Sequence, residues 1–325
     1  MKMIRLGAEG PSVSQFGIGA MSFAGIYGDA TVEQSHQVLN MCREQGVTHI
    51  DTSNVYGKGR SEEIIGQWFA ETPGARQDMH LATKAGITGN PDRPFNNDPE
   101  YLEGCLDESL KRLGIDQVDL FYVHRYDRAY SPEDLGGALK ALIDSGKIRA
   151  VGLSEIAPST LRRVSTECPV AAVQSEYSLS TRAPELGLVQ ACAALDTTLV
   201  AFSPVGRAFL TDAPFSHDHA QSMAFTKDNP RFVQPNYDAN IAATDRFRAL
   251  AADMGEPAAA LAIAWLIAQG DHILPIPGTK NPDHLAELIR GTQIDLTPDD
   301  ITRIETALPV GWAHGDRYTA TQWLG

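Results

Sequence analysis

The chain has 325 residues, of which 43% are hydrophobic and 21% are charged, as is ordinary for a folded globular protein. Its 27 basic and 41 acidic residues give a formal net charge of −14. That negative charge repels nucleic-acid phosphates and anionic membrane surfaces, so we predict no nucleic-acid partner and no membrane partner. The length is compatible with two average domains or with one large α/β barrel.

Four cysteines stand far apart and without C-x-x-C spacing, at Cys42, Cys105, Cys168 and Cys192. This predicts free thiols in a reducing compartment rather than a disulfide framework or a zinc site. The N-terminus has no apolar run of signal-peptide length, and the longest apolar run, 258–268, is too short to span a bilayer. We therefore expect a cytoplasmic protein.

The first fourteen residues predict a small hairpin, because turn residues separate two short apolar runs. Beyond them one pattern repeats, in which a short apolar strand is followed by a loop and an amphipathic helix. The predicted strands are 15–19, 48–51, 80–84, 118–123, 148–153, 172–175, 198–201 and 273–275. The predicted helices are 32–45, 61–69, 99–113, 132–145, 157–166, 184–195, 257–269 and 282–290.

Local signals support these helix boundaries. Asp98, Ser131 and Asn281 each precede a proline and predict capped helix starts. Glycines predict left-handed helix ends at Gly46, Gly114, Gly146 and Gly270. Eight alternating strands and helices without a linker predict an α/β fold, a (β/α)8 TIM barrel forming a single domain over residues 1–325.

Two regions depart from the alternation. Residues 212–239 predict a long loop after the seventh strand, a candidate lid, followed by an extra helix at 240–254. Residues 298–308 predict a second extra helix before an irregular tail. We expect Trp312 and Trp323 in that tail to reach the mouth of a pocket.

Ionisable side chains stand at three adjacent strand ends, where barrels place their active sites. Asp51 ends the second strand, Tyr56 follows in its loop, Lys84 ends the third strand and His124 follows the fourth. Asp51 and Tyr56 alone would suit a cap and a packed ring. The four together, among apolar strand residues, predict a catalytic site.

These four residues suit the reduction of a carbonyl group. A phenol with a pKa of about 10 donates a proton poorly unless its anion is stabilised, and Lys84 can supply the positive charge. Asp51 can pair with Lys84, and His124 can orient a carbonyl oxygen. Since the sequence has no activated nucleophile and no convincing metal cluster, we expect a cofactor to supply the hydride.

Three segments resemble the aldo-keto reductase family in order and spacing: 51–57 (DTSNVYG), 82–84 (ATK) and 123–127 (VHRYD). The resemblance runs from about residue 5 to residue 308. It implies that Tyr56 is the general acid, that Lys84 and Asp51 tune its pKa, and that His124 orients the substrate. The segment 315–318 (GDRY) is similar to a bacterial branch that reduces varied aldehydes, pyridoxal-like compounds and ketones.

The same resemblance implies a cofactor site on the second half of the barrel. Ser154 and Gln174 would bind the nicotinamide carboxamide, and Phe202, where the family usually has Tyr, would stack on the ring. The family's next segment is matched by Ser203, Pro204, Val205, Gly206 and Arg207. Its backbone donors would bind the pyrophosphate.

Gly278, Thr279 and Lys280 follow the eighth strand and precede a helix start, a place that favours phosphate. By resemblance, Lys280 would contact the 2′-phosphate of NADPH. His284 and Leu288 stand where many relatives have Arg and Asn, so NADH stays an alternative.

Position after the first strand makes Met21 a candidate cofactor residue. The segments 23–30, 126–130 and 211–239 are expected to wall the pocket. His217 and His219 are expected at the surface of a loop rather than at a metal.

The leading hypothesis is an NADPH-dependent reductase that converts an aldehyde or ketone to an alcohol. The alternative is a regulatory or accessory protein that senses the nicotinamide cofactor on the same fold. A sugar-phosphate isomerase or metal hydrolase would need a metal cluster or an isolated Glu base. The sequence predicts a small carbonyl compound as partner and leaves monomer and homo-oligomer open.

Overall fold

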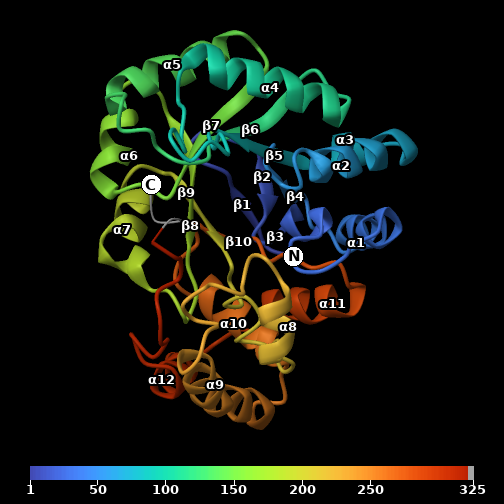
Figure 1. Ribbon diagram of the computed structural model, residues 1–325, viewed down its shortest axis with the longest axis vertical. Coiled ribbons are helices and arrows are strands. Elements are labelled where there is room, and N and C mark those ends of the chain that lie inside the picture. Colours follow the sequence, from blue (N-terminus) through green and yellow to red (C-terminus); the bar gives the residue numbers. More distant parts are fainter. Residues whose placement is uncertain (321–325) are drawn as a thin grey trace.

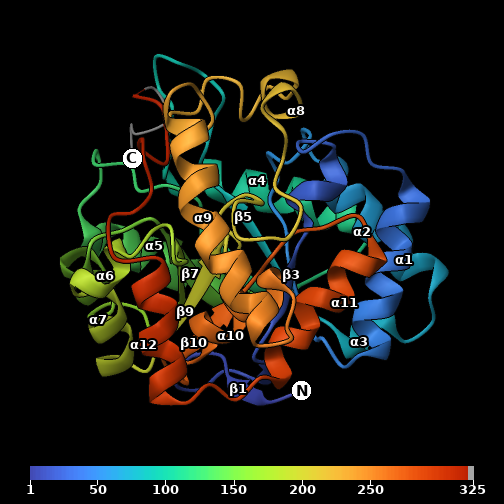
Figure 2. The same cartoon turned by 90° about the horizontal axis from the view of Figure 1, so that it is seen from below.

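The computed structural model describes residues 1–320, so Trp323 lies outside the described residues. An N-terminal hairpin comes first, with β1 (Met3–Arg5) antiparallel to β2 (Ser12–Ser14). Its apolar side chains pack against residues of the barrel interior, including Leu120 and Leu274. The hairpin therefore covers one end of the barrel, and Figure 2 shows it opposite the helix α8 (His217–Ser222).

Eight parallel strands form the barrel, each paired with its neighbours in chain order (Figure 1). They are β3 (Gly17–Gly19), β4 (His49–Asp51), β5 (His80–Ala85), β6 (Val118–Val123), β7 (Ile148–Ser154), β8 (Val170–Glu176), β9 (Thr198–Phe202) and β10 (Ile273–Pro275). The first and last strands approach each other where the N–H of Gly19 donates to the carbonyl of Pro277 at 2.8 Å. The predicted (β/α)8 barrel is thus confirmed as a nearly closed barrel.

Close packing inside the barrel depends on small residues. A Cβ at Gly152 of β7 would lie 2.4 Å from the ring of Tyr122 on β6. Tyr122 itself is fully buried. Glycine therefore leaves the space that the Tyr122 ring fills, below the strand ends that carry the site.

Helices surround the strands on the outside (Figures 1 and 2). Those that follow the strands are α1 (Val32–Glu44), α2 (Arg60–Glu71), α4 (Pro99–Leu113), α5 (Pro132–Asp144), α6 (Pro158–Val164), α7 (Leu188–Ala194), α10 (Ala258–Ile267) and α11 (Pro282–Arg290). The additional helices include α3 (Ala75–Asp78), α9 (Asn236–Asp253) and α12 (Pro298–Ala307). Within residues 1–320 no single helix is long and apolar enough to cross a membrane; α9 and α10 together reach that length but are bent by 90°.

Six of the seven predicted capping residues are confirmed by the capping geometry. Side chains at the predicted caps accept hydrogen bonds from the first turns of α4, α5 and α11. The left-handed ends at Gly46, Gly114 and Gly146 are confirmed as well. The prediction for Gly270 is wrong, because that residue is not left-handed. Its lack of a side chain instead makes room for the His272 ring, which a Cβ would approach to 2.9 Å.

Three other expectations need correction. The predicted loop 212–239 contains α8, which is capped by the Ser216 hydroxyl, and the first turn of α9. The predicted helix 184–195 is divided at Gly187 into the 3-10 helix η2 (Ala183–Leu186) and α7. Trp312 is buried and donates to the carbonyl of Leu179 at 2.8 Å, so it does not reach the pocket mouth.

A buried histidine pair lies at the opposite ends of β4 and β5 from the candidate site. The Nδ1 atoms of His49 and His80 are 3.0 Å apart and their rings stack. Burial, helped by the Arg76 and Arg149 charges, lowers the pKa of His80 to about 3. Burial also lowers the pKa of His49 well below its ordinary value. The folded state therefore resists protonation of both rings.

Acid should destabilise the protein through this pair. The unfolded chain takes up protons near pH 6.5 that the folded rings refuse, so stability falls as pH drops below about 6.5 and toward 3. Between pH 7.5 and 5 the His80 ring should cost about 2 kcal/mol, and the His49 ring adds to that loss. Urea unfolding at both pH values would measure the loss. His80→Gln should lose less stability than the parent protein over that interval, and an equal loss in both would contradict this account.

Candidate active site

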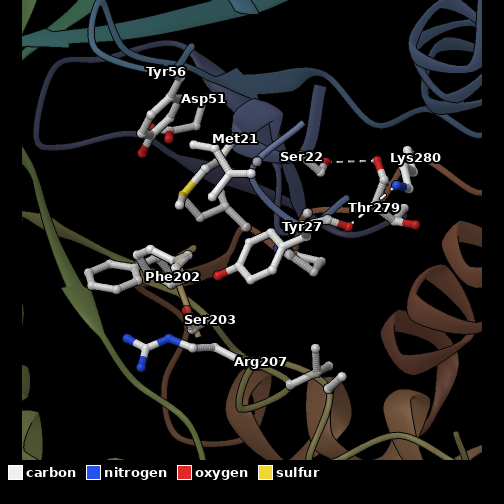
Figure 3. A pocket seen from close by; sticks show the side chains of 18 of the residues that line it. Met21, Ser22, Tyr27, Asp51, Tyr56, Phe202, Ser203, Arg207, Thr279 and Lys280 are labelled. Carbon is white, nitrogen blue, oxygen red and sulfur yellow. Dashed lines mark hydrogen bonds between the residues drawn. The ribbon is translucent and has the colours of Figure 1, made fainter. Parts of the chain in front are cut away.

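A large cavity opens at the carboxyl ends of the strands. Its volume is about 1470 Å³, above the roughly 300–1,000 Å³ usual for one small ligand. Figure 3 shows Tyr56 and Asp51 at one end and Lys280 at the other, with Met21 and Tyr27 between them. The cavity is therefore elongated, with the Tyr56 hydroxyl at one end and the Lys280 ammonium at the other.

Lys84 and Asp51 form a buried ion pair at the cavity floor, which Asp51 helps to line. Lys84 Nζ donates to Asp51 Oδ1 and, at 2.8 Å, to the carbonyl of Thr52. The Gln174 amide donates to the other Asp51 oxygen at 2.7 Å. Burial pushes the pKa of Lys84 down, but Asp51 and Tyr56 outweigh it and raise that pKa, so the ammonium stays charged. The Lys84 ammonium, held in place by Asp51, thus puts a positive charge beside the Tyr56 hydroxyl.

The Tyr56 hydroxyl lies at the cavity floor and accepts a hydrogen bond from Lys84 Nζ at 3.3 Å. Burial raises the pKa of Tyr56, and the Lys84 charge opposes that rise. The phenol is thus protonated at neutral pH. At the same time it has a cation at hand that would stabilise its anion, which is what a proton donor needs.

His124 stands edge-on to Tyr56, with ring centroids 6.0 Å apart. Burial, followed by the charges of Arg125 and Lys84, lowers the pKa of His124 well below its usual range, so the imidazole is neutral. The Ser53 oxygen lies 3.0 Å from His124 Nδ1. If the hydroxyl donates to Nδ1, the proton of the neutral ring lies on Nε2 and is available to a carbonyl oxygen.

Ser53 had no role in the sequence analysis. Ser53 lies two residues after Asp51, inside the segment that resembles the family, and this position could have indicated that it belongs to the site. Its orientation toward His124 comes from the buried turn that follows β4, where the carbonyl of Lys84, 3.3 Å away, is the alternative acceptor for the same hydroxyl proton.

The middle of the cavity is lined by the ends of β7, β8 and β9. On β7 and β8, Ser154 lies opposite Gln174. On β8 and β9, Phe202 lies opposite Glu176, two residues after Gln174. The side chains of Ser154, Gln174 and Phe202 all line the cavity. The structure therefore brings the three predicted nicotinamide-binding residues to one wall.

The turn after β9 has a strained backbone. Ser203, Arg207 and Ala208 have positive φ angles of 50°, 55° and 76°, which cost energy in residues other than glycine and are frequent at binding sites. Ser203, Pro204, Val205 and Arg207 line the cavity. Gly206 does not line it, and its N–H donates to the carbonyl of Ser203 at 2.9 Å.

Arg207 is held by the protein rather than left open to the cavity. Its Nη2 lies 2.7 Å from Glu176, and its Nη1 donates to the carbonyl of Arg317 at 2.6 Å. Arg317 in turn pairs with Glu155. The arginine thus ties the C-terminal segment to the strand ends, and Tyr318 joins the cavity wall beside it.

The far end of the cavity lies between β3 and the start of α11. Lys280 Nζ donates to the carbonyl of Asp29 at 2.5 Å, and Ser22 donates to the carbonyl of Thr279 at 3.1 Å (Figure 3). Gly278 passes so close to Gly19 that a Cβ would lie 2.8 Å from its carbonyl oxygen. The remaining predicted residue here, His284, also lines this end, as does Leu288.

The predicted walls are only partly right. From the first expected segment, residues 26–29 line the cavity, whereas Phe23 is buried in the core. The segment after β9 contributes Phe215 and Phe225, whose rings meet the Tyr27 ring across the cavity. Residues 126–130 are not among those that line it; Arg125 is. Among residues 1–320 no group of three or more His, Cys, Asp or Glu side chains could hold a metal ion.

Comparison with known proteins agrees with this fold. The model of the aldo/keto reductase family matches residues 15–309. The Schizosaccharomyces pombe aldo-keto reductase yakc, whose name includes NADP(+), is 40% identical over 94% of this chain and 92% of its own length. A probable aldo-keto reductase 1 of Glycine max is 36% identical over 97% and 91%.

A solved structure extends the likeness to three dimensions. The glycerol dehydrogenase of Gluconobacter oxydans superposes with a TM-score of 0.81 and 26% identity, over 94% of both chains. The family model and these relatives show that the protein is an NAD(P)H-dependent oxidoreductase. The chain belongs to the aldo/keto reductase family, as its resemblance predicted.

Proposed function

We propose that this protein reduces an aldehyde or ketone to the corresponding alcohol, with NADPH as reductant and Tyr56 as proton donor. The observation that carries the proposal is the charged Lys84–Asp51 pair buried beneath the Tyr56 hydroxyl. NADPH, when bound, supplies a hydride to the carbonyl carbon.

The protein's own residues handle the proton. The Tyr56 O–H gives its proton to the carbonyl oxygen as negative charge develops there, and Lys84 stabilises the remaining phenolate. The neutral His124 ring donates from Nε2 to the same oxygen and orients the carbonyl. Burial of Lys84 and Asp51 strengthens these interactions because water does not screen them.

The cavity fits an extended dinucleotide. Ser154 and Gln174 would hold the nicotinamide carboxamide, since the Gln174 nitrogen is occupied by Asp51 and its oxygen can accept. Phe202 would stack on the ring, and the strained turn that begins at Ser203 would face the pyrophosphate. Lys280 would contact the 2′-phosphate at the far end.

Lys280 should decide the preference for NADPH over NADH. Lys280→Met should weaken NADPH binding by roughly 10- to 150-fold, the size of a lost charge-assisted contact. NADH, which lacks the 2′-phosphate, should bind almost unchanged, and His284→Arg should tighten NADPH. Fluorescence titration of both cofactors would measure this, with Lys140→Met, an exposed lysine on α5, as the matched control. Equal weakening of both cofactors by Lys280→Met would refute the assignment.

The alternative function is a regulatory or accessory protein that senses the cofactor. Following NADPH consumption at 340 nm with a panel of aldehydes and ketones separates the two. Turnover with any of these compounds supports the reductase function. Tight NADPH binding without turnover across the panel would contradict it and favour a cofactor-sensing protein. We place the protein in the cytoplasm, where its four free cysteines would stay reduced.

A further inference from the structure

We propose that Arg125 binds a carboxylate on the substrate, so that the protein prefers carbonyl compounds that carry one. The inference rests on the proposed reductase function and narrows its substrate class. Arg125 follows His124 directly and lines the cavity. Its guanidinium contacts the carbonyl of His124 and the hydroxyl of Ser154, so it lies beside the candidate site.

Arg125 has no direct carboxylate partner among residues 1–320, and its charge reaches Glu155 only at longer range. Within residues 1–320 no carboxylate lies within salt-bridge distance of Arg125, although Arg207, Arg231 and Lys84 all have such partners. The carboxylate that follows Ser154 in the chain, Glu155, is taken by Arg317. A cation in a cavity without a counter-ion favours an anionic ligand.

Part of the guanidinium remains available. Nη1 donates to the carbonyl of His124 at 2.7 Å and to the Ser154 hydroxyl at 3.2 Å. Among the residues the structure describes, Nε and Nη2 of Arg125 have no acceptor, and they are not enclosed by protein. Two adjacent N–H groups suit the two oxygens of a carboxylate.

The backbone that carries Arg125 is fixed in place. The buried Asn97 side chain donates to the carbonyl of Arg125 at 3.0 Å and accepts from the N–H of Asp127 at 2.7 Å. The preceding N–H, of His124, donates to the carbonyl of Ala85 at 2.7 Å. Holding the loop on both sides reduces the ordering cost of binding an anion.

Apolar side chains line the same cavity as Arg125. Ile87 and Phe95 come from the loop after β5, and Phe225 and Tyr318 come from the later segments of the chain. They can surround the organic part of a substrate while Arg125 takes its charged end. The predicted substrate class is therefore an aldehyde or ketone with an apolar body and a carboxylate.

The test compares matched substrates with the whole enzyme and NADPH. The carboxylates are 2-, 3- and 4-formylbenzoate, and each is paired with its neutral methyl ester. For at least one isomer, kcat/KM should favour the carboxylate about tenfold or more, as expected for a charge-assisted contact. That preference should shrink as salt is added, because the guanidinium is partly exposed.

Arg125→Met should reduce the ratio of carboxylate to ester by about 10- to 100-fold, and Arg125→Lys should keep part of it. Arg128→Met, an exposed arginine three residues on, should leave the ratio at its original value. Equal losses for both substrates in Arg125→Met would mean that the residue only holds His124 and Ser154. That result, or no preference in the parent protein, overturns the inference. No turnover of either substrate class would instead contradict the proposed function.

Discussion

Tyr56→Phe should lower kcat for aldehyde reduction by about 10²- to 10⁴-fold, the usual contribution of a positioned proton donor. The substitution keeps the ring and removes only the hydroxyl, which within residues 1–320 receives one hydrogen bond, from Lys84 at 3.3 Å. Folding and cofactor binding should therefore be preserved. Initial rates at 340 nm give kcat, and fluorescence titration should show NADPH affinity within about twofold of the parent value.

Tyr130→Phe provides the matched control. That tyrosine also loses a hydrogen bond, from its hydroxyl to Asp98 at 3.1 Å, but it does not line the cavity. Its kcat should equal that of the parent protein. Retention of more than a tenth of the parent kcat by Tyr56→Phe would remove Tyr56 from the role of proton donor.

Lys84→Met should damage both stability and catalysis. The substitution leaves the Asp51 carboxylate buried without its cation, which costs about 3–5 kcal/mol for a fully buried pair. It also removes the charge that stabilises the phenolate, a loss of about 10²- to 10³-fold in kcat. Urea unfolding and NADPH consumption would measure the two effects separately.

The double variant Lys84→Met, Asp51→Asn distinguishes the two effects. An asparagine removes the unpaired charge and can still accept the Gln174 hydrogen bond, so stability should recover in part. Activity should stay low, because the positive charge below Tyr56 is still missing. Unchanged stability in the single variant would show that the pair is not a buried ion pair.

Much of the fold could be predicted because its signals are local. The barrel strands are short and mostly buried runs, and residues such as Asp98 and Gly114 mark the ends of helices. The helix α8 could not be predicted, because its six residues have no apolar repeat. Tertiary contacts help to fix the segment before it, among them the hydrogen bond from the Tyr237 hydroxyl to the carbonyl of Phe215.

The site divides in the same way. Asp51, Lys84 and His124 could be brought together from sequence, because parallel strands end at one edge of the barrel. The partners of Arg207 could not, since one of them is the backbone of a residue 110 positions later. The pKa of Tyr56 could be predicted only in part. Lys84 lowers this pKa as expected, but burial raises it by more.

Deuterium transfer tests the central claim most directly. NADPH deuterated at the transferring position of C4 would be incubated with the protein and an aldehyde that it consumes, and the alcohol would be examined by mass spectrometry and NMR. The account predicts one deuterium on the former carbonyl carbon and a solvent-derived proton on the oxygen. Alcohol without deuterium on that carbon, from either face of C4, would contradict it.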